Sequence, residues 1–212
     1  LLYDYLNKFG FGEKTGIDLN GEAKGIMFSL DKMGPVETAT TSFGQGISVT
    51  ALQQVTAVSA IVNGGTLYTP YIVSNVGDDS KSPVIKKENI ITKETSDVVK
   101  YALESVVANG SGRNAYIENY RIGGKTGTAQ KVGSDGRYMQ GNYVLSFIGF
   151  MPADNPDYVM YIAIDHAKGV TQYGGVVSAP IARNVFKDII SIHDIKEDTK
   201  GIPKSYRWDD IV

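Results

Sequence analysis

The chain contains 212 residues, of which 42% are hydrophobic and 21% are charged, and its formal net charge is −2. This ordinary globular composition suits one domain or a large piece of one, and interspersed charges without a basic stripe disfavour nucleic-acid binding. Cysteine is absent and the two histidines, His166 and His193, are far apart, so a disulfide framework and a thiolate metal site are excluded and a histidine-rich metal site is disfavoured.

The first half of the chain alternates helical patterns with glycine-rich connections. Thr50 and Gln53 form a capping-box pattern at the start of an apolar stripe, which Asn63-Gly-Gly65 ends. Pro70 interrupts the strand-like run that follows. The expected elements are a helix end over residues 1–9, an irregular connection over 11–30, a helix over 50–62, a strand over 66–76 and an exposed polar segment over 78–87.

The second half contains three strand-like runs between two helical patterns. Thr92 is a candidate N-cap for the first helix, and Ser178, with Pro180 in the first turn, is one for the second. Residues expected to face inward on the first helix are Val98, Val99, Ala102, Leu103, Val106 and Val107, and on the second Ile181, Val185, Phe186, Ile189 and Ile190. The expected elements are helices over 92–109 and 178–190, and strands over 119–131, 142–151 and 157–165.

The three strands predict an antiparallel meander, because short connections rich in turn residues separate them. The second and third strands are apolar on both faces, which indicates covering layers on both sides. We therefore expect an α/β (α+β) fold of three layers, with helices on both sides of an antiparallel sheet. Residues 1–195 form the domain, and residues 196–212 form a charged, solvated tail in which Trp208 is a candidate docking residue. Both histidines and Asp165 are expected at element ends, with Asp165 capping a turn.

The segment Gly124-Lys-Thr-Gly127 first suggests a phosphate-binding loop. That motif requires a glycine where this chain has Asn119, and a helix immediately after the lysine and hydroxyl residue. The residues that follow, Gly127-Thr-Ala-Gln130, are typical of a strand. Nucleotide binding is therefore disfavoured.

The same segment also fits the Lys-Thr-Gly strand of serine acyl-transferases and β-lactamases. Side chains alternate along a strand, so Thr126 and Thr128 share one face, where their hydroxyls can bind a carboxylate, while Lys125 points to the other. Gly127 leaves room for a substrate along the strand edge, and the Thr128 N–H can donate to a developing oxyanion. A solvated lysine beside glycine bulges remains the alternative.

Several further segments, in a fixed order, resemble the C-terminal half of the transpeptidase domain of class B penicillin-binding proteins. The resemblance covers residues 1 to about 190 and implies an incomplete penicillin-binding fold in this chain. It rests on Tyr5-Leu-Asn-Lys-Phe-Gly-Phe-Gly12, Thr15-Gly-Ile-Asp-Leu19 with Gly21-Glu22, Ser42-Phe-Gly-Gln-Gly-Ile-Ser-Val-Thr-Ala-Leu-Gln53, Asn63-Gly-Gly65 with Pro70, Gly124-Lys-Thr-Gly-Thr-Ala-Gln130, Ser146-Phe-Ile-Gly-Phe150 with Pro152, and Tyr173-Gly-Gly175 with Ala179-Pro180.

The resemblance implies roles for matched residues. Lys125 and Thr128 are the expected catalytic residues of this chain, and Thr128 also holds the substrate carboxylate. Gln45 either supports the cleft or only forms a tight turn before the helix. The expected substrate-binding residues are Thr126, Gly127, Thr128, Gln130 and Gln45.

The resemblance further implies a peptidoglycan D,D-transpeptidase on the outer face of the cytoplasmic membrane, anchored by an N-terminal transmembrane helix outside this chain. Its expected partners are the D-Ala-D-Ala stem peptide, β-lactam antibiotics and membrane proteins of the divisome or elongasome, and it needs no cofactor or metal. A β-lactam sensor and a serine β-lactamase of the same fold are the alternatives.

The family's nucleophile motif, Ser-x-x-Lys, has one formal match, Ser29-Leu-Asp-Lys32. We reject this match because it lies in the irregular connection and follows the Phe-Gly-Phe-Gly segment, whereas the family places its nucleophile well before that segment. The family's Ser-x-Asn motif does not occur in the sequence. We therefore expect both motifs upstream of Leu1, in a missing N-terminal half of the same domain. Without that half, the chain should expose apolar surface, be poorly stable and not react with penicillin.

Overall fold

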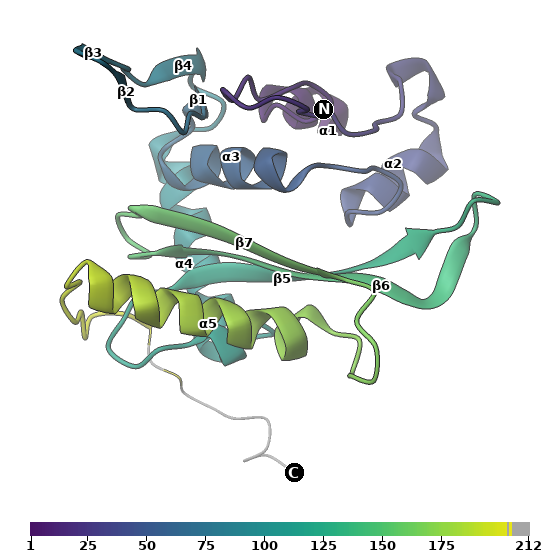
Figure 1. Ribbon diagram of the computed structural model, residues 1–212. Coiled ribbons are helices and arrows are strands. Elements are labelled where there is room, and N and C mark those ends of the chain that lie inside the picture. Colours follow the sequence, from purple (N-terminus) through teal and green to yellow (C-terminus); the bar gives the residue numbers. More distant parts are fainter. Residues whose placement is uncertain (203, 205–212) are drawn as a thin grey trace. The chain divides into compact units, whose positions relative to one another are not determined.

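A computed structural model of the chain describes residues 1–202 and 204 (Figure 1). The chain divides into two compact units, Leu1–Ser96 and Asp97–Val212, which we describe one at a time. Within the described residues, the helices fall short of the length and apolar character that crossing a membrane requires.

The first unit contains three α-helices and a single 3₁₀ turn. The capping-box prediction is confirmed, because Gln53 N donates to Thr50 Oγ1 at 3.1 Å and Thr50 N donates to Gln53 Oε1 at 2.9 Å. The helix over residues 35–42 was not predicted, although Pro35 at its first position is a recognised start signal. The helical elements are α1 (Leu2–Lys8), η1 (Leu30–Lys32), α2 (Pro35–Ser42) and α3 (Ala51–Val62).

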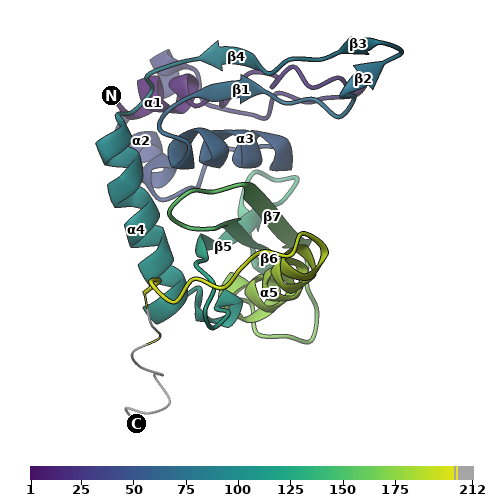
Figure 2. The same ribbon diagram turned by 90° about the vertical axis from the view of Figure 1, so that its left-hand side faces the viewer.

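The strands of the first unit form a nested antiparallel ribbon (Figure 2). Its elements are β1 (Leu67–Thr69), β2 (Asn75–Val76), β3 (Asp79–Ser80) and β4 (Val84–Lys87). β1 pairs with β4, and β2 pairs with β3 across a turn in which Gly77 has a φ of +60°. The predicted single strand over residues 66–76 was therefore wrong in its extent, and the segment over 78–87 is exposed for most of its length but supplies two strands. The pairing of β1 with β4 and the short hairpin of β2 with β3 decided both.

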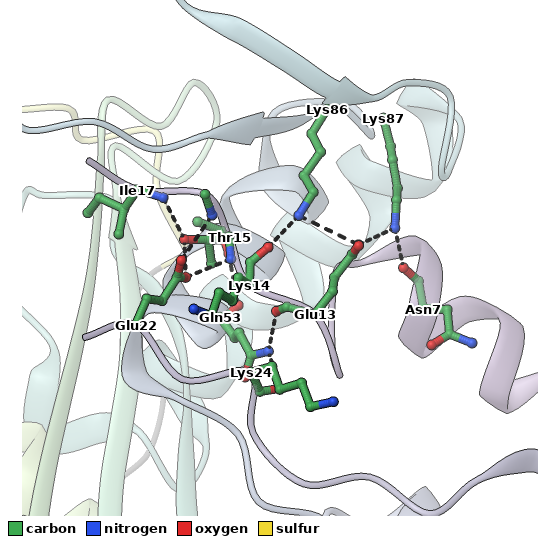
Figure 3. A network of polar contacts seen from close by, with 12 residues as sticks. Asn7, Glu13, Lys14, Thr15, Ile17, Glu22, Lys24, Gln53, Lys86 and Lys87 are labelled. Atoms are coloured by element: carbon green, nitrogen blue, oxygen red, sulfur yellow. Dashed lines mark hydrogen bonds and ion pairs between the residues drawn. The ribbon is translucent and has the colours of Figure 1, made fainter. Parts of the chain in front are cut away.

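A polar network holds the irregular connection over residues 11–30 onto α3 and β4 (Figure 3). Gln53 is 1% exposed, and its Nε2 donates to Glu13 O at 2.8 Å and to Lys24 O at 2.9 Å. Lys87 Nζ reaches Glu13 Oε1 at 2.5 Å and Asn7 O at 2.6 Å. The connection is irregular, as predicted, because an isolated backbone bridge between Ile26 and Ser48 and these side-chain hydrogen bonds hold it in place of a backbone ladder.

The second unit is built on a three-stranded antiparallel sheet in the order β5-β6-β7. The strands are β5 (Gly123–Val132), β6 (Tyr138–Met151) and β7 (Tyr158–Asp165), so the predicted meander is confirmed. Asp165 does not cap a turn as predicted, because its carboxylate accepts two hydrogen bonds from Lys131 Nζ, at 2.7 and 2.9 Å. His166 and His193 are exposed directly after β7 and α5, as expected.

The helix α5 (Gly174–Ile192) covers one face of this sheet (Figures 1 and 2). Its core contacts include Ala182 and Phe186, which pack with Phe147 of β6. The predicted start at Ser178 was wrong, since α5 begins four residues earlier, Pro180 lies inside it, and Ser178 Oγ donates to Leu145 O at 2.8 Å. The mixed helix and antiparallel-sheet class is confirmed, and the second helical layer remains a prediction.

The helix α4 (Lys93–Asn109) begins as predicted, with Thr95 N donating to Thr92 Oγ1 at 3.2 Å. Its buried face differs from the predicted stripe, because Val98 is 69% exposed while Glu104 is 3% exposed. Ile181 of α5 is likewise 39% exposed rather than inward. Apolar periodicity misplaced the inward face of α4 because it treats every charged residue as outward-facing. Glu104 is instead buried and paired with Arg121.

The first residues of the predicted solvated tail are held on the second unit. Asp198 N donates to Asn119 O at 2.8 Å, and Ile202 N donates to Glu104 Oε1 at 3.2 Å. Residues 196, 197, 199 and 200 are exposed as predicted, whereas Asp198 and Ile202 are partly buried and held by these hydrogen bonds. Trp208 lies outside the described residues.

Candidate active site

The Lys-Thr-Gly segment lies in the middle of β5, the outer strand of the described sheet. Lys125 pairs with Ile148 and Gly127 pairs with Ser146 in the register with β6. Because β5 has no second neighbour among the described strands, one row of its backbone N–H and C=O groups faces away from β6. A peptide that lies along this edge could extend the sheet.

The free edge of β5 carries the backbone groups of both threonines. Lys125 Nζ donates to Thr126 O at 3.0 Å, so this carbonyl is available outside the ladder with β6. Backbone groups alternate in direction along an antiparallel strand, so the N–H and C=O of Thr128 share that edge. The Thr128 N–H therefore has the direction that an oxyanion donor requires.

The side chains of Thr126 and Thr128 line one cavity of about 510 Å³. Thr126 Oγ1 lies 3.0 Å from Ser111 Oγ, and Thr128 Oγ1 accepts a hydrogen bond from Gly174 N at 3.3 Å. This confirms that the two threonines share a face, as strand alternation predicted. The volume is in the range of small-molecule sites. The full lining consists of Asn109, Gly110, Ser111, Arg113, Asn114, Thr126, Thr128, Tyr173, Gly174, Gly175 and Val176.

Two glycines beside the cavity are required by close packing. A Cβ at Gly174 would collide with the carbonyl oxygens of Gly127 and Ser146, and one at Gly175 would lie 2.5 Å from Ser111 O. These distances are too short for any side chain. The glycines therefore let the first turn of α5 approach β5 directly, and this approach places Gly174 N beside Thr128.

Gly127 differs from these two glycines, because a Cβ there would contact only the Ser146 hydroxyl, which can rotate away. By contrast, a Cβ at Gly124 would meet the Ile148 carbonyl oxygen at 2.6 Å and the buried ring of Phe147. Packing within the protein therefore requires glycine at position 124 much more strongly than at position 127. Approach of a ligand to β5 stays the predicted reason for Gly127.

Two other predicted site residues, Gln130 and Gln45, have hydrogen bonds of their own. Gln130 does not line the cavity, and its Nε2 donates to Met139 O at 3.1 Å across the hairpin. Gln45 belongs to the first unit, in the turn between α2 and α3, where Gln45 N donates to Thr40 O at 3.0 Å. The roles of both residues stay predictions.

The rejected serine motif, Ser29 to Lys32, lies at an exposed single turn of the first unit. Ser29 precedes η1, a single 3₁₀ turn with no buried residue, and both Ser29 and Lys32 are exposed. A catalytic serine and its lysine need a rigid setting that holds the two side chains in hydrogen-bond reach. The geometry therefore supports the rejection of this match.

The polar cavity residues between α4 and β5 were missed from the sequence. Ser111 follows α4, and Arg113 and Asn114 belong to η2 (Arg113–Ala115). The available signal was the Asn109-Gly-Ser-Gly112 turn, which ends a helix shortly before the Lys-Thr-Gly strand. No local pattern states that this turn folds back beside β5, so only the tertiary structure reveals it.

The polar lining of the cavity suits an anion. Its lining includes hydroxyl and amide residues and the cationic residue Arg113, and no acidic residue is among them. Among the residues that the structure describes, no group of three or more acidic or histidine side chains gathers in a way that could hold a metal ion. The arrangement is suited to holding a carboxylate beside a carbonyl that lies along the β5 edge.

The chain matches the family described as "Penicillin binding protein transpeptidase domain" over residues 1–187. Stage V sporulation protein D of Bacillus subtilis is 55% identical over 216 residues, covering 99% of this chain and 33% of that protein. Peptidoglycan D,D-transpeptidase FtsI of Escherichia coli is 33% identical over 198 residues, covering 93% of this chain and 32% of that protein. This chain therefore spans about a third of the length of these relatives.

Solved structures of penicillin-binding proteins are similar to this chain in fold and in sequence. Penicillin binding protein 3 of Mycobacterium tuberculosis, complexed with ampicillin, has a TM-score of 0.80 and 30% sequence identity to this chain. The similarity covers 92% of this chain and 46% of that one. The aztreonam complex of the same protein has a TM-score of 0.81 at 30% identity and covers 96% of this chain and 48% of that one.

Proposed function

The chain belongs to the penicillin-binding protein transpeptidase domain family, and from this premise we propose that it forms one wall of a peptidoglycan D,D-transpeptidase site. The single observation that carries the proposal is the outer strand β5, whose free edge is bordered by a cavity lined by Thr126 and Thr128. The donor substrate would be a stem peptide ending in D-Ala-D-Ala. β-Lactams, which the relatives' structures contain as ampicillin and aztreonam, would occupy the same edge.

The proposed reaction is acyl transfer by a serine that lies outside these 212 residues. The serine oxygen attacks the carbonyl carbon of the penultimate D-Ala, and the C–N bond to the terminal D-Ala breaks as an ester forms. The proton from the serine goes to the departing amine. An amine of a second stem peptide then attacks the ester, forms the new amide bond and returns the proton to the serine.

The residues of this chain would hold and polarise the donor. The Thr128 N–H donates to the oxyanion, and loss of one such donor typically costs about 3–4 kcal/mol of transition-state stabilisation. Thr126 and Thr128 hold the terminal carboxylate through their hydroxyls. Lys125 supplies positive potential beside the reacting carbonyl. Gly127 lets the donor backbone lie against the strand.

Two assignments from the sequence extend the site. Gln130 follows the motif on β5, and its proposed role is to line the groove beyond the cavity. Gln45 is proposed to support the cleft from the turn before α3. Both assignments rest on matched family positions.

The cellular setting is proposed from the relatives. Their names refer to peptidoglycan transpeptidation and sporulation, and we propose an enzyme on the outer face of the cytoplasmic membrane that works with other membrane-bound cell-wall proteins. Its anchor would be a transmembrane helix outside these 212 residues. The chain taken alone is proposed to be inactive and poorly stable.

The test uses the whole polypeptide that carries this sequence, treated with a fluorescent penicillin. We expect labelling of one serine outside residues 1–212. The labelling rate should be at least about tenfold lower in Lys125→Ala than in the unaltered polypeptide. In a separate assay, the unaltered polypeptide should release D-Ala from a peptide that ends in D-Ala-D-Ala. Labelling without any D-Ala release would instead indicate a β-lactam sensor, and labelling mapped to Ser29 would overturn the proposal.

A further inference from the structure

The cavity beside β5 contains a cation that the Lys-Thr-Gly motif does not account for. Arg113 lines the same cavity as Thr126 and Thr128, and its side chain is half-buried. We propose that Arg113 is a substrate-binding residue that forms the ionic contact with the terminal carboxylate of the acyl donor. This inference rests on the proposed function and adds a specificity determinant to it.

The position of Arg113 is held by contacts on both sides. Arg113 N donates to Gly110 O at 3.2 Å, and Ala115, at the other end of η2, is fully buried in the core of the second unit. Asn114 Nδ2 donates to Gly175 O at 2.7 Å, which ties this short segment to the first turn of α5. The backbone that carries Arg113 is therefore fixed beside the cavity before any ligand arrives, as a preorganised binding residue requires.

The guanidinium of Arg113 has no anionic partner among the described residues, and no acidic residue lines the cavity. Arg121, in the same unit, shows the usual alternative, because it is paired with Glu104 and lies near two further carboxylates. A half-buried arginine without a partner, beside hydroxyl donors, is suited to a carboxylate, which guanidinium can bind through two parallel hydrogen bonds.

Ser111 supports the same assignment as a positioning residue. Its Oγ lies 3.0 Å from Thr126 Oγ1 and can donate to it. When Ser111 donates, the Thr126 hydroxyl is free to donate its own proton to a ligand oxygen. Arg113 and Thr126 then present a charge and a hydroxyl donor to the same carboxylate.

The test compares two thioester donors in the whole polypeptide, N-benzoyl-D-alanyl-thioglycolate and its methyl ester, which differ only in the carboxylate. Thiol release gives kcat/KM for each. In Arg113→Gln we expect kcat/KM to fall about 10- to 100-fold for the acid, the range of hydrogen bonds to charged groups, and to stay unchanged for the ester. Arg113→Lys should recover part of the loss for the acid.

The matched control is Arg183→Gln, which removes the same charge from an exposed position of α5 that does not line the cavity. It should leave both rates unchanged. Equal losses for acid and ester in Arg113→Gln, or no loss for the acid, would overturn the assignment. If the unaltered polypeptide releases thiol from neither donor, the proposed function fails, and the assignment of Arg113 falls with it.

Discussion

Arg121 and Glu104 form a two-point ion pair, with Arg121 Nε donating to Glu104 Oε1 at 3.0 Å and Nη2 donating to Oε2 at 2.8 Å. The Glu104 side chain is only 4% exposed. The hydrogen bond to Glu104 is the main reason that the pKa of Arg121 lies above its usual value. The pair joins α4 to the segment before β5. Glu104 Oε1 also accepts a hydrogen bond from Ile202 N, so three parts of the second unit depend on the pair.

We predict that Arg121→Met destabilises the protein by about 3–5 kcal/mol, because it leaves the buried carboxylate of Glu104 without its partner. Glu104→Gln should cost less, because Arg121 keeps Asp154 and Asp198 beside it. The double variant Glu104→Gln/Arg121→Met should lose less than the sum of the two. Denaturant unfolding of the four proteins measures this coupling. Additive losses would show that the two side chains do not act as a pair.

We predict different effects for alanine at two glycines of β5, one on stability and the other on penicillin labelling. Gly124→Ala should destabilise the protein by about 1–3 kcal/mol, since its Cβ would meet the Ile148 carbonyl oxygen and the Phe147 ring. Gly127→Ala should change stability by less than about 1 kcal/mol, because the Ser146 hydroxyl can rotate. It should nevertheless slow penicillin labelling of the whole polypeptide by at least about tenfold, a barrier increase of about 1.4 kcal/mol.

Thermal unfolding and labelling rates of both variants test this contrast. If Gly127→Ala unfolds as early as Gly124→Ala, then packing within the protein explains the second glycine. If its labelling rate is unchanged, then no ligand lies against β5 at this position.

We predict that Gln53→Leu destabilises the first unit by about 2–4 kcal/mol. The substitution removes the reciprocal cap on Thr50 and leaves the carbonyls of Glu13 and Lys24 without their donor. Amide hydrogen exchange should accelerate over residues 13–24. The control is Gln54→Leu, since the Gln54 side chain makes no hydrogen bond within the described residues. Similar exchange rates in the two variants would show that Gln53 does not hold this connection.

We predict that the ribbon of β1 to β4 loosens in acid through Asp18. Hydrogen bonds from Lys81 and from the N–H of Ile72 and Val73 lower the pKa of Asp18 from 3.8 to about 2. A carboxyl group with a lowered pKa in the folded state stabilises folding above its unfolded pKa, and this contribution disappears as the pH falls from about 4 to about 2. The pKa of Glu22 is also lowered, since hydrogen bonds from Thr15 outweigh desolvation.

An NMR titration that follows the amides of Ile72 and Val73 measures this effect. Asp18→Asn should remove the transition between pH 4 and 2 at these amides, whereas Asp31→Asn, an exposed change in the same unit, should keep it. A titration midpoint for Asp18 at or above 3.8 would contradict the prediction.

Elements with local causes were predictable from the sequence. The capping box of Thr50 and Gln53, the cap at Thr92 and the meander of three apolar strands all depend on residues close in the chain. The same holds for the face shared by Thr126 and Thr128, because alternation along a strand is a property of the strand itself. The motif order that indicated the family is also a property of sequence alone.

The misplaced start of α5 shows what local pattern could not reveal. Ser178 and Pro180 have the signature of a helix start, yet the helix begins at Gly174, where the close packing of α5 on β5 and β6 leaves room only for glycine. The strands at Asp79–Ser80 and Val84–Lys87 were missed for a similar reason, since a polar, exposed segment becomes a strand only through its partner.

The amino-acid sequence by itself determined the fold class, the family and the strand that carries Lys125, Thr126 and Thr128. The tertiary structure alone decided that Arg113 and Ser111 lie beside these threonines and that Glu104 is buried. The physical reason is distance along the chain. Helix caps and strand alternation act between neighbours, whereas a cavity, a buried ion pair and a strand partner bring together residues that no local preference connects.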